Sequence, residues 1–264
     1  MSIERSEARS EMTISRVSIE RSEARSELTI RRLAALGLVL AIATLPACTS
    51  TKSTESSGRA DSARALLAAA KGHLDATSSL RFVLISSGVP RGTSSLTGGK
   101  GVAARPDIFK GDLTVDFAGA QVSVGVIAIG GKTYAKLPFT TSYTVTDPSK
   151  FGVGDPGRLL DPETGISNLL VVAKDPQLGK KSRIGSEVIQ EITATIPGAV
   201  IKSLLASANP TKDVKVTFGV AENSKLLRRA VVTGPFFKSG VDSTYTIVLD
   251  HYGDRVDIRA PSTG

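Results

Sequence analysis

Three features of the sequence indicate an α+β protein built on a large antiparallel sheet. Several segments alternate apolar and polar residues, the pattern of strands with one solvated face. Residues 61–77 instead repeat apolar side chains at helical spacing. The chain is 41% hydrophobic but only 5% aromatic, with no Trp, so its core must be largely aliphatic. We expect eight or more strands, with three or four helices on one face of the sheet.

The first predicted helix spans Asp61–Thr77, where Asp61 or Ser62 can cap the N-terminus. Its apolar face consists of Leu66, Leu67, Ala70 and Leu74. A strand is predicted at 81–87. The glycine-rich stretch at 98–101 lacks the spacing of a phosphate-binding P-loop. We therefore expect a hairpin turn there.

Residues 109–117 alternate without interruption. Phe109, Gly111, Leu113, Val115 and Phe117 share one face, and charged or hydroxyl side chains share the other. The next strand, 121–129, has Val122, Val124 and Val126 on one side, with Ile127 and Ile129 on the opposite side. Both of its faces should be covered near its end. A turn at Gly130-Gly131 predicts a hairpin into 132–137.

The second half begins with a loop at 139–162, which is interrupted by Pro148, Pro156 and Pro162. A short helix is predicted at 163–173, carrying Ile166, Leu169 and Leu170. Further alternation predicts strands at 188–196, 214–220, 226–232 and 245–249, and a helix is predicted at 199–207. No linker follows Gly58, so we expect one domain.

The first fifty residues resemble a lipoprotein export signal. Arg31-Arg32 precede an apolar run, 33–47, that is shorter than the ~20 residues needed to span a bilayer. Leu45-Pro46-Ala47-Cys48 resembles the lipobox of bacterial lipoproteins, although Pro46 is unusual at its position. The resemblance implies a diacylglycerol on the Cys48 thiol and cleavage before it. The alternative is an uncleaved signal anchor with an incidental cysteine.

These features predict three segments. Residues 1–47 form the n-region and signal peptide, 48–58 a flexible polar tether, and 59–264 the exported domain. Within the n-region, Ser2–Glu11 recurs as Ser18–Glu27. Two short polar repeats are too few for a solenoid. They indicate an extended n-region, or a start at Met12 or later.

Charge and motifs argue against nucleic-acid binding and catalysis. Residues 1–47 hold seven Arg and six Glu, so 26 of 33 basic and 19 of 25 acidic residues lie beyond them, and these are scattered. Such a surface predicts no nucleic-acid partner. The two histidines, His73 and His251, are expected at a helix end and in a solvated turn. No zincin, serine-hydrolase or metal-binding motif is present, so we expect neither an enzyme nor a cofactor.

The strongest family resemblance lies in Asp155-Pro156-Gly157-Arg158-Leu159-Leu160-Asp161-Pro162-Glu163-Thr164-Gly165-Ile166-Ser167-Asn168-Leu169-Leu170. This segment resembles the D-P-x-x-x-L-[ND]-P-x-T-G-[LI]-x-N-[LV]-L stretch of the mycobacterial LppX, LprA, LprF and LprG lipoproteins, the LprG branch most of all. Gly111-Asp112-Leu113 and residues 131–137 resemble two further stretches in the same order. The similarity covers roughly residues 60–260.

This resemblance implies a half-barrel sheet wrapped around helices, as in the LolA and LolB carriers, with an apolar cavity for acyl chains. It further implies that 59–264 is a lipid-binding domain on the outer face of the cytoplasmic membrane. The cargo would be an acylated lipid or glycolipid, triacylated by resemblance, carried across the envelope beside a membrane lipid transporter. Leu113 matches a cavity-facing position, and we expect its neighbours to be Val115, Phe117, Val122, Val124, Val126, Leu169 and Leu170.

The residue pattern alone leaves a second function open. An apolar sheet face packed tightly by helices forms a core, and the same face held away from them forms a pocket. The alternative is therefore a structural or glycan-binding envelope lipoprotein with a packed core and no lipid cargo. Co-purification of an apolar ligand would distinguish the two. The segments 209–211 and 235–237 match nothing in the family, so lipid selectivity is not transferred.

Overall fold

The computed structural model describes residues 52–117, 119–151 and 153–263, without the side chains of 52–57, Phe117 and Phe151. The chain divides into two units, Met1–Cys48 and Thr49–Gly264. The predicted signal peptide and Cys48 lie outside the described residues. None of the described helices combines the length and apolar content that a membrane crossing requires.

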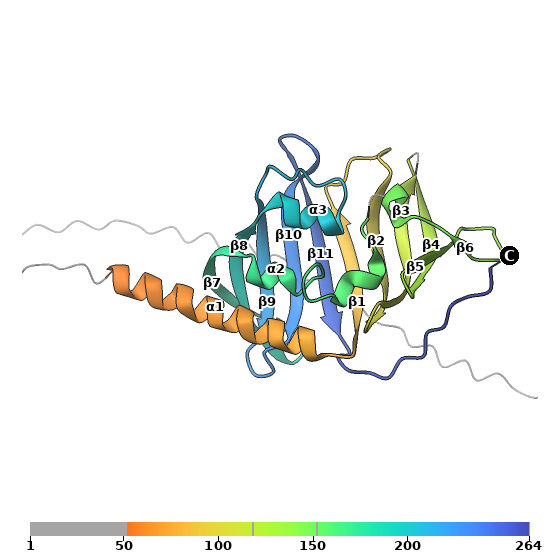
Figure 1. The fold of residues 1–264 in the computed structure, drawn as a ribbon. Helices are drawn as coiled ribbons and strands as arrows, with labels where there is room; N and C mark the ends of the chain where they lie inside the picture. Colours follow the sequence, from red (N-terminus) through yellow and green to blue (C-terminus); the bar gives the residue numbers. More distant parts are fainter. Residues whose placement is uncertain (1–51, 118, 152, 264) are drawn as a thin grey trace, which may run out of the picture. The chain divides into compact units, whose positions relative to one another are not determined.

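Eleven antiparallel strands of the described chain form one open sheet (Figure 1). This confirms the prediction of an α+β fold in which a large antiparallel sheet curves around a few helices. The strands are β1 (Ser79–Ser87), β2 (Ser95–Ala104), β3 (Ile108–Phe117), β4 (Ala120–Ile129), β5 (Lys132–Lys136), β6 (Thr144–Val145), β7 (Lys174–Ile184), β8 (Glu187–Ile196), β9 (Val214–Ala221), β10 (Leu227–Lys238) and β11 (Val241–Asp250).

The order of the strands is β6-β5-β4-β3-β2-β1-β11-β10-β9-β8-β7. The chain thus runs outward from the centre to one edge, crosses to the other edge, and returns strand by strand. The first and last strands pair at the centre, with Phe82 opposite Leu249 and Leu84 opposite Ile247. This central pairing joins the two halves of the sequence into one sheet.

The helical segments lie on one face of the sheet (Figure 1). They are α1 (Lys52–Ala76), α2 (Asn168–Val171) and α3 (Gly198–Leu204), with 3-10 helices η1 (Pro148–Phe151) and η2 (Pro156–Leu160). The long helix α1 packs against β7, β9, β10 and α2. The short helices η2, α2 and α3 come from loops between strands.

Helix α1 buries the apolar face that its sequence predicts. Ala63, Leu67, Ala70 and Leu74 are at most 3% exposed and recur at helical spacing. The helix begins at Lys52, not at Asp61, so residues 52–58 of the expected tether are helical. Cys48 and residues 49–51 lie outside the described residues.

The expected hairpin turn at 98–101 is wrong, because these residues lie within β2. The reason is close packing between strands. A Cβ on Gly101 would meet the Lys110 carbonyl oxygen at 2.5 Å and the Gly111 Cα at 2.7 Å. A register shift between Leu96 and Gly98 disturbs the same strand, as β-bulges do. Glycine in this stretch lets β2 and β3 approach each other closely and does not mark a turn.

Two other elements differ from the prediction. Strand β7 was not expected, because its exposed, lysine-rich sequence and Pro176 hide the strand pattern, and two register shifts interrupt its pairing with β8. It is an edge strand, where charge and proline discourage pairing with other chains. The helix expected at 163–173 is only α2, because Asp161 and Gly165 direct turns before it.

Candidate binding cavity

A cavity of about 180 Å³ lies between the sheet and the short helices. Strands β1, β2, β3, β10 and β11 supply one wall, and the opposite wall comes from η2, α2, α3 and their flanking loops. Its lining consists of Phe82, Leu84, Leu96, Phe109, Leu113, Val153, Gly154, Asp155, Pro156, Leu159, Ile166, Leu169, Ile201, Leu204, Leu205, Ala230, Val232, Tyr245 and Ile247. Nearly all of these side chains are hydrocarbon.

The few polar groups in the lining already have partners. The Tyr245 hydroxyl donates to the Leu96 carbonyl at 2.7 Å, and burial raises the pKa of this phenol, so it remains neutral. The Asp155 carboxylate accepts from the Gly157 N–H at 2.9 Å. Phe82 and Phe109 lie with ring centroids 5.4 Å apart. The cavity therefore suits a ligand whose buried part is hydrocarbon and forms few hydrogen bonds.

A smaller void of about 20 Å³ adjoins the main cavity. The two share Leu96, Leu113, Val153 and Pro156. The smaller one extends along β3 and β4 to Val115, Val124 and Val126. Leu113 therefore stands at the junction of the two voids.

The structure brings most of the predicted cavity residues to one region. Leu113 and Leu169 line the main cavity, and the register sets Leu113 opposite Val124 and Val115 opposite Val122. Val122 packs against the core without lining either void, and Leu170 is buried beside them. Phe117 belongs to β3, and its side chain lies outside the described residues.

Sequence reasoning missed the central part of the sheet wall. Phe82 and Leu84, Ala230 and Val232, and Tyr245 and Ile247 each form an i, i+2 pair on a strand that the alternation does predict. What the pattern lacks is the order of the strands. Once β1 is known to pair with β11, and β11 with β10, these three pairs fall side by side.

Residues 155–170, here called the cover segment, build the opposite wall together with α3 and the Val153-Gly154 strip. Asp155 caps η2, and Asp161 accepts from the N–H groups of Glu163 at 2.9 Å and Thr164 at 2.8 Å. These bonds lower the pKa of Asp161, the one from Thr164 most. A Cβ on Gly165 would meet three carbonyl oxygens at 2.5–2.7 Å. The polar residues of the cover segment thus fix the shape of a turn, and the apolar residues of the same segment line the cavity.

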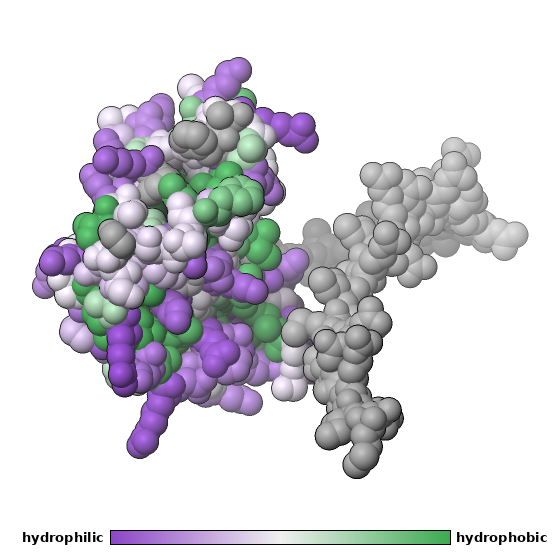
Figure 2. All heavy atoms as spheres, turned by 90° about the vertical axis from the view of Figure 1, so that its right-hand side faces the viewer, coloured by the Kyte–Doolittle hydropathy of each residue, from purple (hydrophilic) through white to green (hydrophobic). Residues whose placement is uncertain are grey.

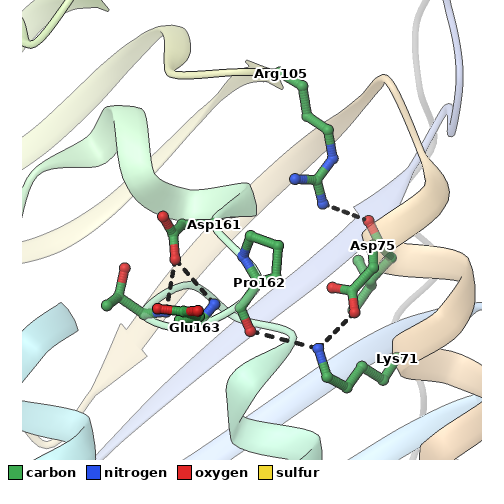
Figure 3. A network of polar contacts seen from close by, with 8 residues as sticks. Lys71, Asp75, Arg105, Asp161, Pro162 and Glu163 are labelled. Atoms are coloured by element: carbon green, nitrogen blue, oxygen red, sulfur yellow. Dashed lines mark hydrogen bonds and ion pairs between the residues drawn. The ribbon is translucent and has the colours of Figure 1, made fainter.

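Polar contacts fasten the cover segment to the end of α1 (Figure 3). Lys71 pairs with Asp75 and also points to the Pro162 carbonyl, 3.4 Å away. Arg105, which follows β2, donates to the carbonyls of Leu74 at 3.1 Å and Thr77 at 3.0 Å. These contacts hold the cover segment, α1 and the sheet together near the C-terminal end of α1.

The residues with catalytic or metal-binding chemistry lie elsewhere. His73 is exposed on α1, and His251 contacts Asp250 at 2.9 Å with 52% of its side chain exposed. Neither histidine lines the cavity. Within the described ranges no cluster of three or more His, Cys, Asp or Glu side chains could hold a metal ion.

Solved structures similar to this chain share its architecture. The crystal structure of LprF from Mycobacterium bovis superposes with a TM-score of 0.63 at 18% identity, covering 77% of this chain and 98% of LprF. The crystal structure of the Mycobacterium tuberculosis lipoprotein LppX gives 0.56 at 16% identity, covering 75% and 99%. At these identities the likeness establishes the fold.

Sequence comparison leads to the same group of proteins. The lipoarabinomannan carrier protein LprG of Mycobacterium tuberculosis (strain ATCC 25618 / H37Rv) is 24% identical over 234 residues, covering 87% of this chain and 94% of LprG. LprG of Mycobacterium bovis (strain BCG / Pasteur 1173P2) matches equally well. The model of the LppX_LprAFG lipoproteins matches residues 62–258, from within α1 to beyond β11. The chain belongs to the LppX_LprAFG lipoprotein family.

Proposed function

We propose that this protein is a membrane-anchored lipoprotein that binds an acylated lipid in its cavity and carries it across the cell envelope. The observation that carries the proposal is the cavity itself. A packed interior leaves few voids larger than a water molecule, and a water occupies roughly 30 Å³. The main cavity, at about 180 Å³, is several times that size.

Acyl chains match the chemistry of the lining. Each CH₂ group moved from water into an apolar site contributes about 0.8 kcal/mol, whereas a polar ligand would lose hydrogen bonds to water and find few replacements. Leu84, Leu159, Leu204, Val232 and Ile247 line the cavity and remain partly exposed. Hydrocarbon cargo would cover these surfaces.

The printed name of LprG as a lipoarabinomannan carrier protein supports a lipid that bears a glycan. We therefore propose an acylated glycolipid as the cargo. Three acyl chains, and exchange with a membrane lipid transporter, are proposed from the family resemblance alone. The competing function, a structural or glycan-binding lipoprotein without cargo, would need no void between the sheet and the cover segment.

The proposed anchor is a diacylglycerol on Cys48, which would hold the domain at the outer face of the cytoplasmic membrane by a short tether. Cys48→Ser removes the acceptor thiol. We expect this variant to accumulate as unprocessed precursor or to leave the membrane fraction. Retention of processed Cys48→Ser protein in membranes would contradict the anchor.

The decisive experiment is native mass spectrometry of the protein purified from a mycobacterial host, followed by lipid extraction. We expect one acylated lipid per protein. Leu113→Trp should reduce this loading by filling the cavity, whereas Val83→Trp is a matched control because Val83 is 43% exposed and does not line the cavity. A folded, empty wild-type protein would overturn the proposal and favour the structural alternative.

A further inference from the structure

One turn of the chain presents a fully exposed aromatic side chain, Phe139, to the solvent. This side chain is 106% exposed, and Leu137 and Val145, which flank it in the same hairpin, are exposed as well. The Phe139 turn, residues 137–140, lies between β5 and β6 at one edge of the sheet (Figure 1). Figure 2 faces this side of the molecule, where apolar surface lies among hydrophilic side chains. None of the three residues lines the main cavity, so the cargo does not explain their exposure.

The backbone at Phe139 has a conformation that aromatic residues rarely adopt. The Thr140 N–H donates to the Leu137 carbonyl at 3.2 Å, and Phe139 has a φ of 65°. With Pro138 before it, this is the geometry of a type II turn, whose third residue is normally Gly. Four non-Gly residues of the described chain have a positive φ, and the other three carry polar side chains. At Phe139 the chain therefore keeps a large apolar side chain where glycine would fit with less strain.

The hairpin holds the Phe139 turn in place. Strand β5 pairs with β6, and Tyr143 forms a bridge with Thr263 near the end of the chain. Within the turn, the Thr140 hydroxyl donates to the Leu137 carbonyl at 2.7 Å, so both the N–H and the hydroxyl of Thr140 have a partner there. A turn whose polar groups bond to one another can enter an apolar medium at a lower cost in free energy.

The sequence around the turn suits the interface between lipid and water. Residues 137–146 contain no charged side chain, and Lys136 and Asp147 bound this run. The Lys136 ammonium can reach lipid phosphates while its alkyl stem lies along apolar surface, and aromatic residues concentrate at the same depth of a membrane. A protein partner would have to cover about 800 Å² with a complementary surface. A bilayer accepts a single apolar turn without a matching shape.

We infer that the Phe139 turn inserts into the interfacial region of a lipid bilayer and forms a membrane contact of its own. Insertion removes the exposed surfaces of Phe139 and Leu137 from water. The proposed anchor at Cys48 would fix one point of the protein, whereas a second contact would also fix the orientation of the domain on the bilayer. The inference goes beyond the proposed function, because insertion of the turn does not depend on cargo in the cavity.

The test uses tryptophan fluorescence, because the sequence has no Trp. Phe139→Trp gives the full chain a single fluorophore in the turn, and Ile85→Trp is the matched control at an exposed apolar position of β1. Both proteins are reconstituted with vesicles of phosphatidylcholine and phosphatidylglycerol, with and without brominated acyl chains. We expect the emission of Phe139→Trp to shift to shorter wavelength. Brominated chains should quench it several-fold more strongly than the emission of Ile85→Trp.

The other outcomes of this test are distinct. Equal quenching at the two positions, or an unshifted emission of Phe139→Trp on vesicles, would overturn the inference. A shift that appears without vesicles and grows with protein concentration would instead assign the turn to contact between copies of this chain. Native mass spectrometry measures the lipid in the cavity separately, so failure of the membrane contact leaves the proposed cargo intact.

A glycine variant separates membrane contact from folding. Phe139→Gly relieves the backbone strain of the turn, so its melting temperature in solution should equal or exceed that of the wild type. Leu137→Trp places a fluorophore in the same turn, and adding Phe139→Gly to it should reduce quenching by brominated chains several-fold. Unchanged quenching would overturn the inference. A lower melting temperature for Phe139→Gly would show that Phe139 serves the fold instead.

Discussion

The two halves of the sheet bury their apolar faces in different ways. In the packed half, β7 to β9 lie beneath α1, and Ile192, Phe218 and Val220 are fully buried. In the cavity half, β1 to β3 and β11 face the cover segment and α3, and several lining residues remain partly exposed. Strand β10 borders both halves. Apart from β7 and the glycine-rich β2, the strands of both halves show the same alternation.

The difference lies in the covering elements. Helix α1 is long and regular, and Ala63 and Ala70 let it approach the strands closely while Leu67 and Leu74 fill the gaps. The cover segment is a series of turns whose shape is set by its own hydrogen bonds at Asp155 and Asp161. A segment that satisfies its own backbone can stand away from the sheet and leave a void.

The largest test of this comparison removes a large side chain from each half. Phe218→Ala in the packed half should lower the free energy of unfolding by about 3–5 kcal/mol, because it opens a new cavity in dense packing. Leu159→Ala borders space that already exists, so its loss should be less than about 2 kcal/mol. Urea denaturation of both variants measures this. Equal losses would show that the two halves are packed alike.

We expect an intermediate effect on stability when a larger side chain is introduced into each half. Val216→Trp, at a buried position of β9 that lies away from the cavity, should cost about 1–3 kcal/mol or more through strain. Leu113→Trp can extend into the adjoining voids and should cost less. Thermal unfolding of the ligand-free proteins compares them. A lower melting temperature for Leu113→Trp than for Val216→Trp would contradict a cavity at this position.

The smallest effect concerns the cover segment. Asp161→Ala removes the acceptor for two backbone N–H groups and should cost about 1 kcal/mol at neutral pH. Because hydrogen bonding lowers the pKa of Asp161 below its ordinary value of 3.8, the contribution is complete above that value and is lost as pH falls through the folded pKa.

The difference in unfolding free energy between wild type and Asp161→Ala should therefore shrink below about pH 4. Asp242→Ala, at an exposed position, is the control and should show no such trend. A difference that stays constant from neutral to acid pH would mean that the carboxylate does not stabilise the turn.

Local patterns predicted the regular strands of this fold well. The alternation at 109–117 corresponds to β3, and that at 121–129 to β4, because the two strands pair without a register shift. Ile127 is 5% exposed, so β4 is covered on both faces near its end, as the sequence predicts. The helical spacing at 61–77 identified the buried face of α1. In these segments local preference and tertiary burial agree.

The misses occur where tertiary contact determines the structure. Gly101 in β2 is required by the approach of a neighbouring strand. The edge strand β7 has few apolar residues, and two register shifts interrupt its pairing with β8, so alternation does not reveal it. The cavity is of the same kind, because its sheet wall depends on the pairing of β1 with β11 and its depth depends on the turns of the cover segment. Neither the strand pairing nor the depth of the cavity can be deduced from a short stretch of sequence.

The strand order also constrains when the protein can fold. Arg81 pairs with Asp250, so the central contact closes a loop of nearly the whole domain, and such long-range contacts slow folding. Until β11 is available, β1 and β10 both present unpaired edges that can recruit strands from other chains. A chain truncated before β11 would thus expose the unpaired edges of β1 and β10 at the centre of its sheet. We expect such a chain to aggregate.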